Sequence, residues 1–110
     1  MTRRATVQRA IDEMVRRIVR RFRPEKIILF GSHARGDAGP DSDVDLLVVM
    51  RVRGSRRKKA TEIELALAGL GVPKDLLLVT PEQVERDRDQ LGTIIRPALR
   101  EGKVLYERSA

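Results

Sequence analysis

The chain has 110 residues, enough for one domain, so we expect residues 1–110 to fold as a single unit. Hydrophobic residues make up 41% and charged residues 35%, and 23 Lys and Arg against 16 Asp and Glu leave a net charge of +7, which favours an anionic ligand or partner with phosphate as the first candidate. The lack of cysteine excludes disulfides, thiolate zinc sites and a cysteine nucleophile. We find neither the apolar stretch of a signal peptide nor that of a membrane span, so we expect a cytoplasmic protein that does not enter a membrane.

The first pattern along the chain is helical. Apolar residues recur at helical spacing from Val7 to Phe22, and arginines fill most of the intervening positions. Pro24 ends the pattern, because the residue before a proline avoids helical geometry. We therefore expect an amphipathic helix with a basic outer face.

Shorter elements follow, with turn residues between them. We expect strands at residues 26–30, 43–50, 75–79 and 103–107, and a loop at residues 33–42 that can begin with one helical turn. We expect a helix from Ala60 to Leu70 that Gly71 ends, and a helix near residues 93–101 that Gly102 ends. Between them, a short helix should begin at the capping sequence Thr80-Pro81-Glu82-Gln83. The short connection between the first two strands favours an antiparallel pair, whereas residues 51–74 are long enough for a crossover between parallel strands. These features predict an α/β (α+β) fold, with helices packed on a mixed sheet of about four strands.

Two carboxylates interrupt the otherwise apolar second strand. Side chains alternate between the faces of a strand, so Asp43 and Asp45 point the same way with Cα atoms about 6.5–7 Å apart. Two unpaired carboxylates would repel each other, so they need a cation. Mg²⁺ fits, because it binds one or two carboxylates and completes its shell with water and substrate phosphates.

A phosphate site is expected beside these carboxylates. Gly31 and Ser32 end the first strand, where glycine lets a ligand approach the backbone and the following N–H groups and the serine hydroxyl can hold an anion. A nucleoside triphosphate would satisfy both halves of this arrangement. Its phosphates would lie on Gly31 and Ser32, and the metal would bridge them to Asp43 and Asp45.

A third acid, Asp75, begins the strand that we expect to run parallel to the second. The starts of parallel neighbours lie side by side, so Asp75 should be level with the first two carboxylates. Three carboxylates around one or two Mg²⁺ ions can align a hydroxyl with an α-phosphate and stabilise the leaving pyrophosphate. Asp75 would be either a metal ligand or the base for the hydroxyl.

The segment GSHARGDAGPDSDVDLLVV resembles the signature of the polymerase-β-like nucleotidyltransferase superfamily: a Gly-Ser pair, ten residues, an Asp-x-Asp pair and a later carboxylate. Ten residues separate Ser32 from Asp43, and the likeness continues to the end of the chain. Such a small chain looks like the minimal nucleotidyltransferases (MNT), whose known members transfer AMP from ATP and act as antitoxins beside a helical HEPN-type ribonuclease toxin. His33 stands where many relatives have arginine.

This resemblance implies a Mg²⁺-dependent transfer of NMP, with ATP as the expected donor of AMP, to a hydroxyl of a partner protein or another acceptor. It makes Asp43, Asp45 and Asp75 catalytic and metal-binding, and it places Gly31, Ser32 and Arg35 at the nucleotide. Arg35 can instead hold its loop through hydrogen bonds, which we favour. Larger relatives add a domain that positions the acceptor, so here we expect a partner or a second copy to do so.

Two other functions remain open at this stage. The chain can be a non-catalytic antitoxin that masks its partner, or an RNA-binding accessory protein that uses its positive charge. The basic run from Arg51 to Lys59 is either solvated surface or a patch for RNA or an acidic partner.

Below the carboxylates the strand residues Leu47, Val49, Leu77 and Val79 form an apolar face. If the helices cover only the opposite face, a partner or a second copy must cover this one, and the chain should then not be a free monomer.

Overall fold

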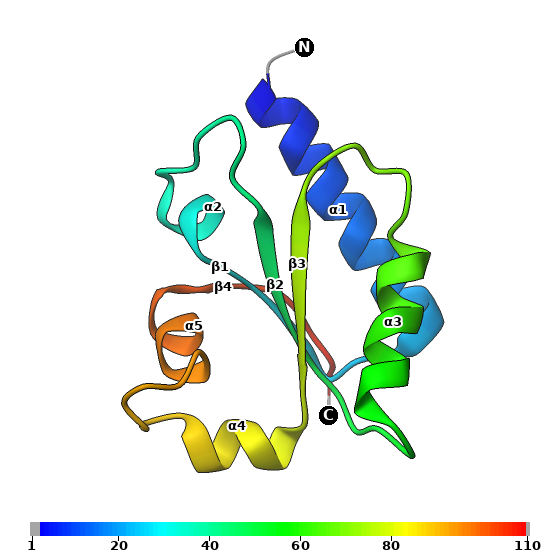
Figure 1. Cartoon of the computed structure of the whole chain (residues 1–110), viewed down its shortest axis with the longest axis vertical. Helices are drawn as coiled ribbons and strands as arrows, with labels where there is room; N and C mark the ends of the chain where they lie inside the picture. Colours follow the sequence, from blue (N-terminus) through cyan, green and yellow to red (C-terminus); the bar gives the residue numbers. More distant parts are fainter. Residues whose placement is uncertain (1–2, 110) are drawn as a thin grey trace.

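The computed structural model describes residues 3–109 and contains four strands and five helices in that range (Figure 1). In chain order these are α1 (Arg3–Phe22), β1 (Lys26–Phe30), α2 (Ser32–Arg35), β2 (Val44–Val49), α3 (Arg56–Ala66), β3 (Lys74–Val79), α4 (Pro81–Asp87), α5 (Ile95–Glu101) and β4 (Lys103–Glu107). Among the described helices, none combines the length and the apolar content that crossing a bilayer requires.

The four strands form one mixed sheet in the order β3-β2-β1-β4. β1 pairs antiparallel with β2 and with β4, and β2 pairs parallel with β3. The short β1–β2 connection and the helical crossover through α3 produce these directions. The predicted fold class is therefore confirmed, including the antiparallel and parallel pairs.

Helices α1 and α3 cover one face of the sheet. Alternation along the strands turns Ile27 and Leu29 of β1 and Leu46 and Val48 of β2 toward this layer, where they pack with buried residues of both helices. The apolar stripe of α1 is buried, which leaves its arginines outside. This larger cluster is the main hydrophobic core.

Helices α4 and α5 cover the other face (Figure 1). Leu47 and Val49 of β2 and Val79 of β3 are buried there against Ile95 and Ala98 of α5. This is the apolar face below the carboxylates that was expected to need a second copy if the chain left it open. That condition is not met, because the chain's own helices cover the face.

The end of α3 differs from the prediction. The helix stops at Ala66 rather than continuing through Leu70 to Gly71. Arg17 of α1 donates hydrogen bonds to the carbonyl oxygens of Ala66 and Ala68, each at 3.0 Å. A tertiary contact thus binds the free carbonyls at the helix end, a role that sequence reasoning had assigned to a terminal glycine.

Candidate active site

Gly31 connects β1 to the single turn of α2 in a backbone conformation that glycine favours, with φ of +74°. Its carbonyl oxygen accepts hydrogen bonds from the N–H groups of Ala34 and Arg35, each at 3.1 Å. A Cβ atom at this position would collide with the carboxylate of Asp45, since it would lie 3.1 Å from Cγ and closer still to Oδ2. The Gly-Ser turn and the Asp-x-Asp strand are therefore in direct contact.

Asp45 and Asp75 are neighbours across the parallel pair of strands. The register of β2 and β3 pairs these two residues, which places their Cα atoms about 4.8 Å apart and their side chains on the same face. On the other side of β2 the register pairs Asp45 with Phe30, the residue before Gly31. Asp45 is thus the central residue of the candidate site.

Asp43 is exposed and lies one residue before β2. The N–H of Val44 donates to the carbonyl oxygen of Pro73 at 2.8 Å, so the chain enters β2 beside the point at which it enters β3. This contact places Asp43 at the same end of the two strands as Asp75, and Asp43 is close enough to Asp45 to interact with it electrostatically.

The charge around Asp45 favours its neutral form. Partial burial raises the pKa of this carboxyl, and the negative charges of Asp75 and Asp43 raise it further, while His33 and Arg35 oppose the shift. In the described part of the chain, the carboxylates of Asp45 and of its two acidic neighbours accept no hydrogen bond and form no salt bridge. The protein's own side chains therefore leave excess negative charge at this site.

Two residues that follow the Gly-Ser pair, His33 and Arg35, make contacts that stabilise the loop between β1 and β2. Arg35 forms salt bridges with Asp37 at 3.2 Å and Glu101 at 3.9 Å, in keeping with the structural role that we favoured for it. A ring nitrogen of His33, Nε2, lies 3.2 Å from the carbonyl oxygen of Ser42, at the far end of the loop. Sequence reasoning missed this contact, because nine residues separate the two and no local pattern marks the pair.

Ser32 is the first residue of α2 and is half-buried. Its carbonyl oxygen accepts from the N–H groups of Gly36 and Asp37, which closes the turn. Its hydroxyl has no hydrogen-bond partner among the described residues and remains available to a ligand.

The family model described as "Nucleotidyltransferase domain" matches residues 11–105, which include the Gly-Ser turn and all three aspartates. The chain belongs to this family. A curated relative, "Putative protein adenylyltransferase MJ0604" from Methanocaldococcus jannaschii, is 48% identical over 44 residues. The match covers 38% of this chain and 44% of the relative, so it spans less than half of either protein.

Solved structures support the same fold. A variant of the toxin–antitoxin complex MntA-HpeT superposes with a TM-score of 0.63 at 20% identity, covering 90% of this chain and 73% of the matched chain. A toxin–antitoxin structure with AMP-PNP gives a TM-score of 0.56 at 18% identity, covering 98% of this chain and 76% of the other. These similarities establish the nucleotidyltransferase fold.

A hollow of about 930 Å³ lies on the α1 side of this nucleotidyltransferase domain. Its lining includes His33, Ser42 and Val44, but none of the three aspartates. Val44 and Asp45 point to opposite faces of β2, so the hollow and the carboxylates are separated by the strand. We assign the candidate site to the carboxylates, because the lining of the hollow has no acidic group that could bind a cation.

The donor set at Asp45 suits Mg²⁺. Carboxylate oxygens are the ligands that this ion prefers, and the excess negative charge around Asp45 favours a bound cation. No three acidic or histidine side chains of residues 3–109 come close enough to share one ion. One or two protein carboxylates are sufficient for Mg²⁺, because water and phosphates complete its shell.

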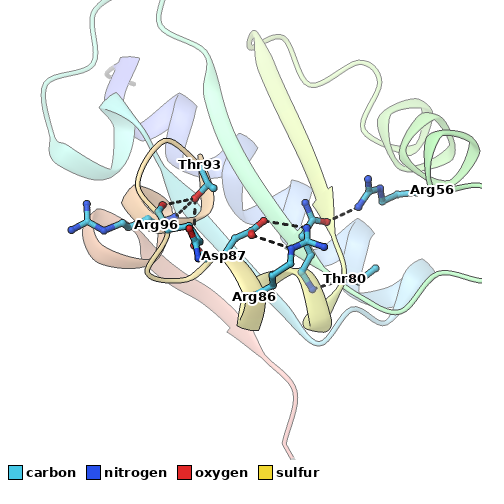
Figure 2. Close-up of polar contacts among 8 residues, drawn as sticks. Arg56, Thr80, Arg86, Asp87, Thr93 and Arg96 are labelled. Carbon is cyan, nitrogen blue, oxygen red and sulfur yellow. Dashed lines mark hydrogen bonds and ion pairs between the residues drawn. The ribbon is translucent and has the colours of Figure 1, made fainter.

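Polar contacts hold together α4, α5 and the loop between them, on the face of the sheet that carries the carboxylates (Figure 2). Thr80 caps α4 by accepting the N–H of Gln83 at 3.1 Å. The hydroxyl of Thr93 donates to the carbonyl oxygens of Gln90 at 3.0 Å and Asp87 at 3.4 Å, and it accepts the N–H of Arg96 at 3.4 Å. One hydroxyl therefore joins the end of α4 to the start of α5.

Proposed function

We propose that this nucleotidyltransferase domain transfers AMP from ATP, with Mg²⁺, to a hydroxyl group of a partner protein in the cytoplasm. The observation that carries the proposal is the position of Asp45. Its carboxylate touches the Gly31 turn, lies level with Asp75 on the next strand, and has no cationic partner among the described residues.

The candidate site offers groups for the phosphates and for the metal ion of a Mg²⁺-bound nucleoside triphosphate. The hydroxyl of Ser32 and the backbone at Gly31, where no side chain intervenes, would contact the phosphates. Asp43 and Asp45 would hold Mg²⁺, and Asp75 would be the base or a ligand of a second ion. The bound ion would neutralise the phosphate charge and stabilise the leaving group.

The proposed reaction is a displacement at the α-phosphorus. The acceptor oxygen forms a bond to this phosphorus, and the bond between the α-phosphorus and the bridging oxygen to the β-phosphate breaks. Pyrophosphate leaves with that bond's electron pair. The proton of the acceptor hydroxyl goes to a carboxylate, for which Asp75 is placed beside Asp45.

The similarities to other proteins support a protein acceptor. One curated relative is named as a putative protein adenylyltransferase, and two of the matched structures are toxin–antitoxin proteins, one of them with AMP-PNP. We therefore propose that the chain acts as an antitoxin, with a HEPN-type helical protein as both its partner and its acceptor. Residues 1–110 would form the catalytic unit, and the partner would supply the acceptor hydroxyl.

The test is transfer of label from ATP to a co-purified HEPN-type partner. Label on the α-phosphate should appear on the partner and label on the γ-phosphate should not, and the intact mass of the partner should rise by about 329 Da per AMP. Asp45→Asn should reduce transfer by about two orders of magnitude or more, since it removes a charge that is needed in the transition state. Asp41→Asn, which changes an exposed acid of the same loop region, should retain activity.

Two results would contradict catalysis. Neutralisation of the toxin without label would favour the masking antitoxin, and full transfer by Asp45→Asn would exclude the assigned site.

A further inference from the structure

Positive charge is concentrated on one layer of the molecule. Residues 6–23 carry six arginines against two acids, and residues 51–66 carry six basic residues against two acids. The remaining segments 24–50 and 67–109 carry nine basic and twelve acidic residues, the three aspartates of the candidate site among them. The net positive charge therefore belongs to α1, α3 and the loop before α3, and the rest of the chain is slightly acidic.

Many of these cations have no acidic partner. Arg9, Arg20, Arg57 and Lys58 are exposed and form no salt bridge with any residue of the described chain. On α1, Arg9, Arg16 and Arg20 point away from the buried stripe and span about 16 Å along the helix axis. They form a row of guanidinium groups on the outer surface.

Tertiary contacts join the two helices into one surface, which we call the basic layer (residues 6–23 and 51–66). Arg21 of α1 and Lys59 of α3 both lie over the ring of Phe22, at 5.6 and 5.8 Å from its centre. Further along, Arg17 binds the carbonyl oxygens at the end of α3. Helices α1 and α3 thus lie side by side in opposite directions (Figure 1).

A small hollow of about 280 Å³ opens on this layer. It is lined by Glu13, Ala66 and four arginines, namely Arg16, Arg17, Arg20 and Arg21. Glu13 pairs with the first two at 2.9 and 3.0 Å, while Arg20 has no partner in the described chain. The hollow therefore retains an excess of positive charge.

We propose that the basic layer binds the phosphate backbone of a double-stranded nucleic acid. The described cations of α1 are all arginine, whose planar guanidinium forms paired hydrogen bonds with phosphate oxygens. A row of exposed cations about 16 Å long on a pair of adjacent helices matches a regular polyanion, and contacts of this kind bind duplexes without reading base sequence.

Other occupants fit this surface less well. Single-stranded nucleic acid needs exposed aromatic rings for stacking, but Phe22 is the one aromatic residue of the layer and is half-buried under two cations. A membrane needs an exposed apolar face, whereas the apolar stripe of α1 is in the core and Leu65 is the one exposed large apolar residue of the described layer. A protein interface normally has an apolar centre, which this layer also lacks.

The basic layer is separate from the candidate active site. α1 and α3 pack on the face of the sheet that holds Leu46 and Val48, whereas Asp45 lies on the face that α4 and α5 cover. The proposed binding is therefore independent of nucleotidyl transfer, and failure of either proposal leaves the other standing.

The experiment measures fluorescence anisotropy of labelled 24-base-pair duplexes, one RNA and one DNA of arbitrary sequence, over a range of salt concentrations. The test variant carries Arg9→Gln, Arg20→Gln and Lys58→Gln. The control carries Arg88→Gln, Arg96→Gln and Arg100→Gln, which lie outside the layer. Each triple lowers the net charge from +7 to +4, and urea unfolding verifies that both are folded.

We expect the wild type to bind at least one duplex, and the test triple to weaken that binding at least tenfold. The slope of log affinity against log salt should fall by about 2–3, since each lost phosphate contact contributes about 0.9. The control triple should stay within twofold of the wild type. Equal losses of duplex affinity in both triple variants would show that the effect depends only on net charge, and would overturn the proposal.

Three further results would also overturn it. These are no duplex binding by the folded wild type, displacement of the duplex by polyglutamate at equal charge concentration, and equally tight binding to vesicles that contain phosphatidylserine. The second would assign the layer to an acidic protein and the third to a membrane surface.

Discussion

At the scale of single residues, the candidate site depends on one close approach between backbone and carboxylate. Gly31 has a positive φ and lies so near Asp45 that any side chain would displace the carboxylate. The same glycine begins the turn that holds Ser32. A change here is therefore expected to affect both the proposed phosphate contacts and the proposed metal contacts.

Replacing Gly31 with alanine should destabilise the protein by about 1–3 kcal/mol, because the backbone conformation is strained for a residue with Cβ and because that Cβ meets Asp45. Urea unfolding measures the loss. Gly36→Ala is the matched control, since Gly36 also has a positive φ but has free space around it. Gly31→Ala should cost more stability than Gly36→Ala, and this difference should largely disappear in an Asp45→Ala background. An unchanged difference would show that contact with the carboxylate of Asp45 is unimportant.

The raised pKa of Asp45 predicts a pH-dependent stability in the absence of metal. Burial and the neighbouring carboxylates lift this pKa above its unfolded value, so the folded state holds the proton more tightly. The contribution to stability is complete below the unfolded pKa and is lost as the pH rises through the folded pKa.

Asp45→Asn removes this loss. In EDTA, the urea midpoint of the variant should increase relative to that of the wild type as the pH rises from 4. This gain in midpoint should level off above the folded pKa. Asp41→Asn should show no such trend. A gain that shrinks with rising pH would contradict the assigned electrostatics.

At the scale of elements, α4 and α5 form the layer beneath the candidate site, and a single hydroxyl joins them. Thr93 links the last turn of α4 to the first turn of α5, while Ile95 and Ala98 of α5 pack on the strands that carry the carboxylates (Figure 2). The position of this layer therefore depends on a polar contact as well as on hydrophobic burial.

Thr93→Val should cost about 1 kcal/mol, because it keeps the shape of the side chain and removes its hydrogen bonds. Thr61→Val is the control. Thr61 donates one exposed hydrogen bond to Arg57 within α3, so its loss should stay below about 0.5 kcal/mol. Equal costs in urea unfolding would mean that Thr93 does not join the two helices.

At the scale of the whole molecule, the sheet separates two charged surfaces. The acidic site lies on the α4–α5 face, and the two helices of the basic layer, α1 and α3, cover the opposite face. Most of the net positive charge of the chain therefore lies on the helices across the sheet from the candidate site.

This separation predicts two independent ligands. Saturating AMP-PNP with Mg²⁺ should change the affinity for the duplex by less than twofold, and Asp45→Asn should abolish the nucleotide-induced rise in Tm while it leaves duplex binding intact. Anisotropy and thermal unfolding of the same samples provide both readings. Competition between nucleotide and duplex would contradict the separation.

Much of the architecture was predictable because its signals are local. The apolar run of β2 and the connection lengths depend on residues close in sequence, and they correctly predicted the mixed sheet. The capping sequence at Thr80 is also local, and it correctly predicted the start of α4. The predicted end of α3 was wrong, because a carbonyl at the end of this helix is bound by Arg17, which is 49 residues away from Ala66 in the sequence. The contact of His33 with Ser42 had no sequence signal for a similar reason.

The sequence by itself determined the family and the identity of the candidate site residues, since both are contained in the spacing of short motifs around Gly31, Asp43 and Asp75. Only the tertiary structure decided which groups meet, because contact depends on strand register and helix packing. It placed Asp45 against Gly31 and level with Asp75, covered the apolar face with the chain's own α4 and α5, and gathered the positive charge on the opposite side of the sheet.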